Sequence, residues 1–375
     1  MDSVEPFTSA PSSCGIRNWN VTRGSIASVL SMAHTLIIPN ETRTRLVEYL
    51  ASLQAGCAFA GKRLRDHLAD MELATLTDAA FLDALLNTKP PQIFAESAVA
   101  GDGSDWNLTE LGILGDISIA VPVTIFDNGH HTAPTPHPEP LTGTLVFTPG
   151  ALLRNGRGQP PADWVEVTLA DGTLNREGYY GLYERRLLPV FQHVNASAAA
   201  QSKQALLTIP GLGCGQFAGP STGRLGAELL AVMERFLTRH GASFPHIKAV
   251  YFDPFNECEN SRQQIQGISL MVRPLLQGNA GKSQLCPPPA YAEDGDDFSD
   301  CVLFSIVAWD HVSWPGNDYF GGSRCTDDGV KAAATDSMAV LTGVEGSYDP
   351  QCGAYLPPAP YRNWDDVVRQ NGLRL

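Results

Sequence analysis

The sequence predicts an α/β fold in which parallel strands form a sheet flanked by helices, preceded by a helical N-terminal extension. Three observations predict it. Apolar residues keep helical spacing through much of the first ninety residues, a strand–loop–helix–strand unit occupies 205–252, and another buried strand follows at 302–308. Two strands joined through a helix imply parallel pairing. Ligands are then expected at the carboxyl ends of these strands.

Composition narrows the class of protein and its partners. The 375 residues, 43% hydrophobic and 18% charged, are typical of a globular chain that can bury a large core. A net charge of −14 argues against nucleic acid or an anionic membrane as partner, because an acidic surface repels both. The eight cysteines show no CxxC pair, and neither a signal peptide nor a membrane-length apolar run is evident. We therefore expect reduced thiols and a cytoplasmic location.

The chain divides into three predicted regions. Residues 1–20 carry acids, prolines and polar residues and are expected to be a flexible N-terminus. Residues 21–90 form the helical extension, with apolar faces such as that of Leu46 and Leu50. We expect the remaining 91–375 to be the catalytic domain.

The elements of this domain follow from periodicity and turn residues. Pro189 should kink or divide the first long helix, and a Pro/His-rich loop at 129–140 separates the first two strands. We predict strands at 117–126, 144–148, 205–209, 247–252 and 302–308, helices at 177–200, 225–240 and 330–341, and an exposed excursion at 277–300.

A glycine-rich loop lies between the strand 205–209 and the helix 225–240. Glycines there let backbone N–H groups approach an anion, and the helix N-terminus favours negative charge, so a diphosphate is a natural ligand. The loop is neither a Walker loop nor a dinucleotide fingerprint. On the glycines alone, a tight strand-to-helix turn without a ligand is the favoured interpretation. The candidate ligand residues are Gly211, Gly213, Cys214, Gly215, Gln216 and Phe217.

The segment 309–336 is unusually acidic for a loop between a buried strand and a helix. Its aspartates would repel one another unless they bind ribose hydroxyls, a cation or a cationic substrate such as an arginine guanidinium. Each also has a structural interpretation: a helix cap, a turn residue, or a strand end. The candidates are Asp310, Asn317, Asp318, Asp327, Asp328 and Asp336.

Both loops resemble those of macrodomains, which bind ADP-ribose. Gly213, Gly215, Phe217 and Gly219 match the macrodomain diphosphate loop, and Asn317, Gly321 and Gly322, followed by Val330 and Ala332 to Ala334, look like the loop that clasps the distal ribose. In ordinary macrodomains the ribose loop precedes the diphosphate loop, whereas here it follows. The resemblance thus implies a macrodomain-like mixed sheet flanked by helices, circularly permuted or otherwise rearranged.

The spacing of Asp310, Asp318 and Asp328, by eight and ten residues, is similar to that of the MavL-type macrodomain hydrolases. Those enzymes release ADP-ribose from arginine, including that of ADP-ribosylated ubiquitin. The resemblance implies that these three aspartates are catalytic. It further implies that Asn317, Gly321, Gly322 and Asp327 bind the ligand, and that the partners are ADP-ribose and an ADP-ribosylated protein.

Further groups are left with two interpretations. Thr326-Asp327-Asp328 also resembles the magnesium element of the all-helical ADP-ribosylglycohydrolases, but the predicted strands argue against that fold, so we expect no metal cofactor. His130, His131 and His137 are interpreted as part of a solvated loop rather than metal ligands. Gly115 to Ser118 resembles the macrodomain element whose aspartate contacts adenine, which makes Asp116 a candidate, and Tyr348, Tyr355 and Tyr361 could stack on adenine.

Two alternative functions remain open at this point. The first is a non-catalytic ADP-ribose reader, in which the same loops bind but do not cleave. The second is a hydrolase of Glu- or Asp-linked ADP-ribose or of poly-ADP-ribose. An assay of arginine-linked substrate separates an arginine hydrolase from a reader, whereas ADP-ribose binding does not. Cleavage of an ester-linked substrate while the arginine-linked one stays intact would favour the second alternative.

Overall fold

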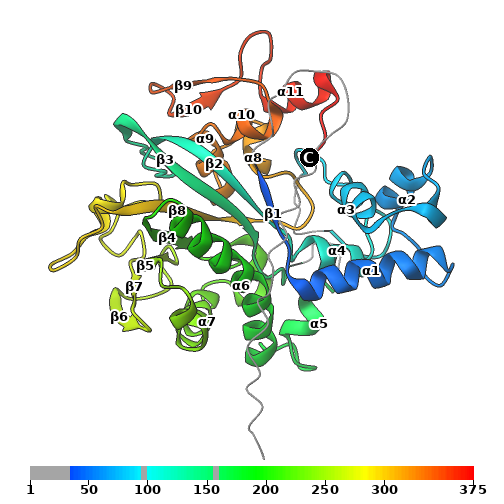
Figure 1. Cartoon of the computed structure of the whole chain (residues 1–375), viewed down its shortest axis with the longest axis horizontal. Helices are drawn as coiled ribbons and strands as arrows, with labels where there is room; N and C mark the ends of the chain where they lie inside the picture. The colour runs from blue at the N-terminus through cyan, green and yellow to red at the C-terminus, as the bar shows by residue number, and fades with distance from the viewer. Residues whose placement is uncertain (1–33, 94–98, 155–159) are drawn as a thin grey trace, which may run out of the picture.

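The computed structural model describes residues 34–93, 99–154 and 160–375. The predicted flexible N-terminus and the beginning of the helical extension lie outside these residues. The fold is built on one eight-stranded mixed sheet with helices on both faces and a further group of helices beside its β1 edge (Figure 1). This confirms the α/β class.

The strands lie in the order β1-β2-β3-β8-β4-β5-β7-β6. The central strands β3, β8, β4, β5 and β7 are parallel, whereas β1, β2 and β6 run antiparallel to their neighbours. A small hairpin, β9–β10, lies apart from the sheet. The strand bounds are Thr35–Ile37 (β1), Ser118–Asp127 (β2), Pro136–Pro149 (β3), Gln204–Pro210 (β4), Ile247–Asp253 (β5), Ser261–Ile265 (β6), Ile268–Val272 (β7), Cys301–Trp309 (β8), Ser347–Asp349 (β9) and Ala354–Leu356 (β10).

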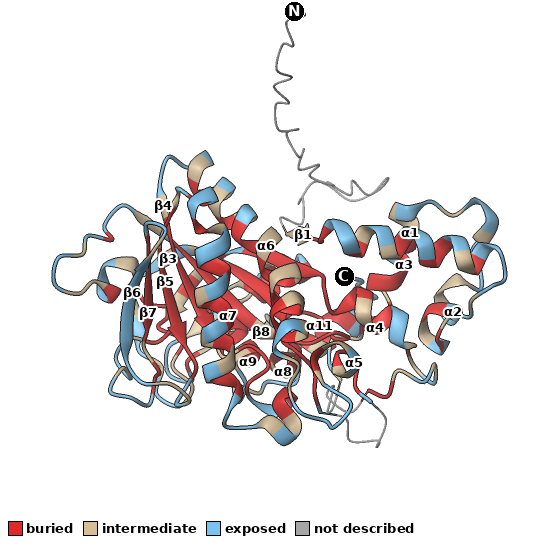
Figure 2. Cartoon of the chain, turned by 90° about the horizontal axis from the view of Figure 1, so that it is seen from below, coloured by how far each residue is buried: buried red, intermediate tan, exposed pale blue. Residues whose placement is uncertain are grey.

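Helices cover both faces of the sheet, so most of β4, β5, β7 and β8 and the second part of β3 are buried (Figure 2). On one face, α6 (Arg176–Ala200) and α7 (Leu225–His240) share an apolar core with strand residues such as Leu207. The opposite face carries Leu206 and is covered by α8 (Asn317–Phe320), α9 (Asp327–Ala333), α10 (Ser337–Thr342) and α11 (Trp364–Asn371). Successive strand residues alternate between the two faces, which is why β4 carries apolar side chains on both of them.

The N-terminal helices form a third apolar cluster beside the edge of the sheet. They are α1 (Asn40–Gln54), α2 (Lys62–Leu68), α3 (Asp78–Leu86) and α4 (Leu108–Leu114). Thr77 caps α3, and Asn107 and Glu110 form a reciprocal capping box on α4. Shorter helices are α5 (Trp164–Val167) and the 3₁₀ turns Leu73–Thr75, Gln216–Ser221 (η3), Gly241–Ser243 and Pro288–Tyr291.

This cluster does not separate cleanly from the sheet. β1 lies inside the segment predicted to be a helical extension, yet it pairs with β2 at the sheet edge. The cluster also contains Ile117 and Val312, which belong to the predicted catalytic domain. The division at residue 90 therefore stays a prediction. In the part of the chain that the structure describes, no helix is long and apolar enough to cross a membrane.

The strand–loop–helix–strand unit agrees closely with its prediction. The helix 225–240 is confirmed at both ends, and the strands 205–209, 247–252 and 302–308 differ by at most one residue at either end. In these elements the apolar pattern of the sequence marks the residues that are buried, which is why the predicted bounds agree with the structure.

Pro189 does not divide α6, contrary to one interpretation of the sequence. The proline removes one backbone hydrogen bond, which costs about 3 kcal/mol in a helix interior. Fully buried side chains lie on both sides of it, including Leu187, Val190 and Phe191. Each contributes about 1.5–3 kcal/mol when buried, so packing holds the helix continuous.

Three other predictions were wrong in part. β3 begins at Pro136, inside the predicted loop. The helix 330–341 is two helices, α9 and α10, because the Ala334 carbonyl accepts a hydrogen bond from the Phe126 amide (2.8 Å) instead of continuing the helix. The excursion 277–300 is not wholly exposed, since Tyr291 is fully buried against the sheet.

Candidate functional site

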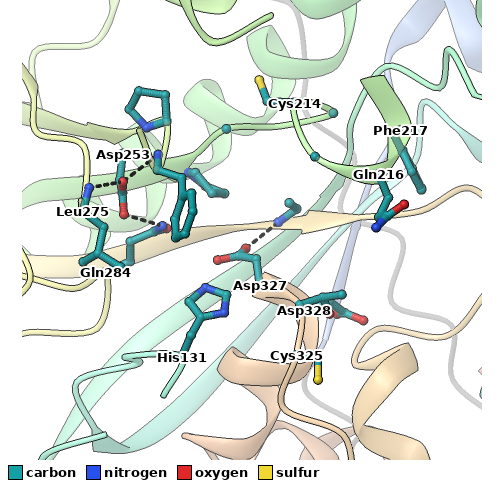
Figure 3. Close-up of a pocket in the computed structure, with 18 of the residues that line it drawn as sticks. His131, Cys214, Gln216, Phe217, Asp253, Leu275, Gln284, Cys325, Asp327 and Asp328 are labelled. Atoms are coloured by element: carbon teal, nitrogen blue, oxygen red, sulfur yellow. Dashed lines mark hydrogen bonds between the residues drawn. The ribbon is translucent and has the colours of Figure 1, made fainter. Parts of the chain in front are cut away.

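A cavity of about 900 Å³ opens at the carboxyl ends of β8, β4 and β5. Figure 3 shows Cys214, Gln216 and Phe217 on one side of this space, Cys325, Asp327 and Asp328 on another, and Asp253 with Gln284 on a third. The residues that the sequence singled out in the two loops line it, except Gly321, Gly322 and Asp336. Asp336 instead accepts a hydrogen bond from the Thr124 amide (2.8 Å) and ties α10 to β2. Those two glycines follow the end of α8. The two loops meet because β4 and β8, far apart in sequence, are neighbours in the sheet.

The glycine loop is a tight turn that also borders the cavity. Gly213 has φ +70°, and a Cβ there would lie 2.8 Å from the backbone N and O of Ala151. Only glycine meets both constraints. Tyr183 fixes the turn, because its hydroxyl donates to the Leu212 carbonyl (2.6 Å) and accepts from the Ala151 amide (3.1 Å). At Gly215, by contrast, no atom lies within 4 Å of a Cβ position, so this glycine borders open space.

The side chains of this loop are apolar or amide, and a cation lies beside them. The Cys214 thiol is buried, and desolvation together with the nearby charge of Glu257 raises its pKa, so it stays protonated. The Gln216 side chain accepts a hydrogen bond from Arg154, which also lines the cavity. Sequence analysis missed Arg154, because a single exposed arginine outside the loop gives no motif.

The acidic side of the cavity is carried by the start of α9. Its N-cap is Thr326, whose hydroxyl accepts from the Gly329 amide (3.2 Å), so neither Asp327 nor Asp328 is needed as a cap. The Asp327 carboxylate accepts from the Ala308 amide (2.8 Å) and from the buried ammonium of Lys331 (3.1 Å). Asp327 thereby ties α9 to the end of β8.

Asp328 is buried, and its side chain has one hydrogen-bond partner among the described residues: Oδ1 accepts from the Gly316 amide (2.7 Å). Burial and the neighbouring charge of Asp310, with smaller contributions from Asp318 and Asp327, raise the pKa of this carboxyl well above its usual range. These surroundings favour its neutral, protonated form, which can donate a hydrogen bond or a proton.

Asp318 differs from Asp328 in exposure and in partners. It lies in the first turn of α8 and is half-buried at the cavity wall. Within the described ranges, no donor or cation contacts its carboxylate. The preceding residue is fixed, since the Asn317 Oδ1 accepts from the Ile93 amide (2.7 Å). Asp318 is therefore free to interact with a ligand.

Asp310 follows the last residue of β8 and also borders the cavity. Its carboxylate accepts from the amides of Val312 (2.6 Å) and Ser313 (2.7 Å) and from the Ser313 hydroxyl. These contacts hold the turn after the strand. The structural interpretation of this residue is therefore correct, and its charge still acts on Asp328.

Asp116, proposed as an adenine contact, lies elsewhere. Its buried carboxylate accepts from Thr42 and pairs with the guanidinium groups of Arg45, Arg185 and Arg186. Burial alone would raise its pKa, but the arginine charges lower it below its usual value. Both of its carboxylate oxygens are engaged, so Asp116 stabilises the fold, and it does not line the cavity.

The candidate histidines and tyrosines also differ in whether they border the cavity or pack within the fold. His130 and His131 line the cavity, and the His131 ring lies 6.4 Å from that of Phe255. His137 contacts the Leu285 carbonyl (2.9 Å), and Tyr348 donates to Asp127. Tyr355 is buried and stacked on Trp364. No cluster of His, Cys, Asp or Glu within the described ranges could hold a metal ion.

The end of the cavity away from the acids was missed by sequence analysis. It is formed by Phe255 and Leu276, both about half exposed, which follow β5 and β7. Asp253 holds this region together, because its carboxylate accepts from the amides of Phe255 (2.9 Å) and Leu275 (2.8 Å) and from the Gln284 side chain (3.2 Å). The sequence signal for this region was Asp253 itself, an aspartate at the end of a buried strand.

The comparisons with known proteins agree with this geometry. The family model described as the macrodomain effector MavL matches residues 34–361. No curated protein matches the chain. The matched span includes the whole sheet and both loops, so the macrodomain-like fold is confirmed and the function is related to ADP-ribose. The chain belongs to the MavL macrodomain effector family.

Proposed function

We propose that this protein is an ADP-ribosylhydrolase that cleaves the N-glycosidic bond between ADP-ribose and a protein arginine. The observation that carries the proposal is that, at the acidic end of the cavity, some aspartates are paired with a cation and others are not. Asp310, Asp318, Asp327 and Asp328 gather there. Lys331 pairs with Asp327, but no described cation pairs with Asp318 or Asp328. An arginine guanidinium supplies the missing positive charge.

The order of strands gives the proposed direction of the ligand. The acids follow β8, the glycine loop follows β4, and the apolar residues Phe255 and Leu276 follow β5 and β7. The distal ribose would lie at the acids, held by Asn317, with the diphosphate at the glycine loop beside Arg154. The adenine would lie against Phe255 and Leu276. A cavity of about 900 Å³ is large enough for one such dinucleotide-sized ligand.

The different surroundings of Asp318 and Asp328 suit them to opposite roles: Asp318 is half-buried at the cavity wall, whereas Asp328 is buried and its pKa is raised. In the proposed reaction the C1″–N bond breaks with its electron pair going to the guanidine nitrogen, and a water oxygen bonds to C1″. The Asp318 carboxylate accepts the proton of that water and stabilises the cationic sugar, while the neutral Asp328 donates its proton to the leaving guanidine. The proton taken up by Asp318 then replaces the one lost by Asp328.

Asp310 has a supporting role in this proposal. Its oxygens are occupied by its own turn, so it is poorly placed to bind the ribose or the guanidinium directly. Its charge instead disfavours ionisation of Asp328.

The test is release of ADP-ribose from an arginine-modified protein, with ADP-ribosylated ubiquitin as the first substrate. Asp318→Asn and Asp328→Asn should each slow release by about 10²–10⁴-fold, as expected for loss of a general base or acid. The affinity for free ADP-ribose should be retained. Asp300→Asn serves as control, because that residue pairs with Lys203 on the surface away from the cavity. Full activity in both variants would refute the assignment.

The same assay separates the alternatives. A wild-type protein that binds ADP-ribose but cleaves no linkage would be a reader, and cleavage of ester-linked but not arginine-linked substrate would make the linkage assignment wrong. A cytoplasmic location stays a prediction.

A further inference from the structure

A short segment between α3 and residue 93 lies along the loop that carries the acids. We call residues 89–93 the strap. The Pro90 carbonyl accepts from the Trp314 amide (3.0 Å), and the Lys89 carbonyl accepts from the Trp314 indole (3.1 Å). The Ile93 amide donates to the Asn317 side chain (2.7 Å). The strap therefore contacts the loop at several points between β8 and α8.

The side chain of Lys89 extends the same contact toward Asp310. Its ammonium donates to the His311 carbonyl (2.7 Å) and lies 4.1 Å from the centre of the Trp309 ring. It is thus placed beside the two residues that flank Asp310. The lysine is 3% exposed, although it comes from the N-terminal helical layer.

A lysine at this position is unfavourable for stability alone. An ammonium has three donors, and the described structure gives this one a single hydrogen-bond acceptor and an aromatic face. Burying an incompletely paired charge destabilises the folded state, and desolvation lowers the pKa of Lys89 to about 7 despite the opposing charge of Asp310. A methionine would fill the same space against Trp309 without that penalty. The charge is thus explained better by an effect on the loop than by packing.

We propose that Lys89 is a positioning residue, which fixes the loop 309–317 so that Asp310, Asn317 and the adjoining Asp318 keep the geometry required for cleavage. The role of the loop in cleavage rests on the proposed function. The contact between Lys89 and the loop does not.

The strap acts on cleavage through the position of Asp318. The Asp318 carboxylate has no hydrogen-bond or ion-pair partner among the described residues, so its position depends on the backbone of α8 and on Asn317, which the strap holds. A displacement of about 1 Å of a catalytic group can slow a reaction by about 10²-fold. Loss of the Lys89 ammonium should therefore reduce kcat more than it weakens binding, which relies on the glycine loop.

The experiment compares Lys89→Met with wild type in the full chain. Hydrogen exchange of the amides of Val312, Ser313 and Trp314 measures how firmly the loop is held, independently of activity. We expect faster exchange in this loop, kcat for ADP-ribosyl-arginine cleavage lower by about 10–100-fold, KM little changed, and a melting temperature equal or higher. Lys89→Gln keeps an N–H donor for the His311 carbonyl and should recover part of kcat; it also carries the test if Lys89→Met does not fold.

Lys62→Met is the matched control, since Lys62 is an exposed lysine of the same helical layer paired with Asp66. It should change neither loop exchange nor kcat. Unchanged loop exchange in Lys89→Met, or faster exchange with an unchanged kcat, would overturn the proposal. If wild type does not cleave the arginine linkage, the proposed function fails, and loop exchange still decides whether Lys89 holds the loop.

Discussion

Two groups of buried carboxylates lie on either side of the dipeptide Asp310-His311, and they are compensated in opposite ways. On one side, Asp163 pairs with Arg186 (2.8 Å) and contacts His311 (3.2 Å). Burial alone would raise its pKa, but the charges of Arg186 and His311 hold that pKa far below its usual range. On the other side, Asp328 has one backbone donor and three neighbouring aspartates, and its pKa is raised.

The carboxylates paired with Arg186 stabilise the fold, whereas the group around Asp328 can interact with a substrate. The Asp163 and Asp116 network joins α1, α6 and the loop after β3 around Arg186, and every charge in it has a partner. The Asp328 group is locally unfavourable and is held in place by the backbone of its two helices. A locally unfavourable group at a cavity, held in place by a well-paired surrounding structure, is a common feature of functional sites.

The largest expected effect on stability comes from breaking the paired side. Arg186→Met leaves Asp116 and Asp163 buried without their shared cation, and removing one partner of a buried ion pair typically lowers the free energy of unfolding by about 3–5 kcal/mol. Urea unfolding measures it. Arg176→Met removes the exposed pair with Glu228 and should leave the free energy of unfolding nearly unchanged, because solvent screens that pair. Equal effects of the two substitutions would show that the Arg186 network does not stabilise the fold.

We expect pH to change the stability contributions of Asp328 and Asp163 in opposite directions. In wild type the raised pKa of Asp328 stabilises the fold at low pH, and stability is lost as pH rises from the unfolded value, about 3.9, through the native pKa. Asp328→Asn cannot ionise, so its melting temperature should exceed that of wild type increasingly as pH rises. Each unit of pKa difference corresponds to about 1.4 kcal/mol.

Asp163→Asn should behave in the reverse way. The native pKa of Asp163 is depressed, so its stabilisation is present above the unfolded value and lost as pH falls toward the native one. The variant should be less stable than wild type at neutral pH, and the gap should close in acid. Parallel melting curves for the two variants between pH 3 and 9, with no divergence, would contradict the comparison.

The smallest effect is expected from metal removal. Because the acids would be compensated by the substrate guanidinium, EDTA should leave release of ADP-ribose from arginine-linked substrate unchanged. Activity that is lost in EDTA and restored by Mg²⁺ would show that a cation, not the substrate alone, compensates Asp318 and Asp328.

The sequence predicted those parts of the fold and site in which chemistry is local. The strand–loop–helix unit and the glycine and acidic loops could be read from periodicity, glycines and carboxylates, and most of the named residues border one cavity. Arg154, Phe255 and Lys89 could not be predicted, because they reach the site only through strand order and through packing of the N-terminal helices. Asp116 was misassigned because four residues of motif do not reveal three arginines from α1 and α6.

The position of β8 between β3 and β4 has a consequence for how the chain is made. β3 and β4 leave the ribosome one after the other, yet they are not hydrogen-bonded to each other in the sheet, and the strand that joins them is synthesised after β5, β6 and β7. Until then both strands have an unpaired inner edge, which is prone to pairing with other chains. The strand that closes this gap also brings the aspartates, so the nascent protein closes its sheet and completes its cavity in the same step.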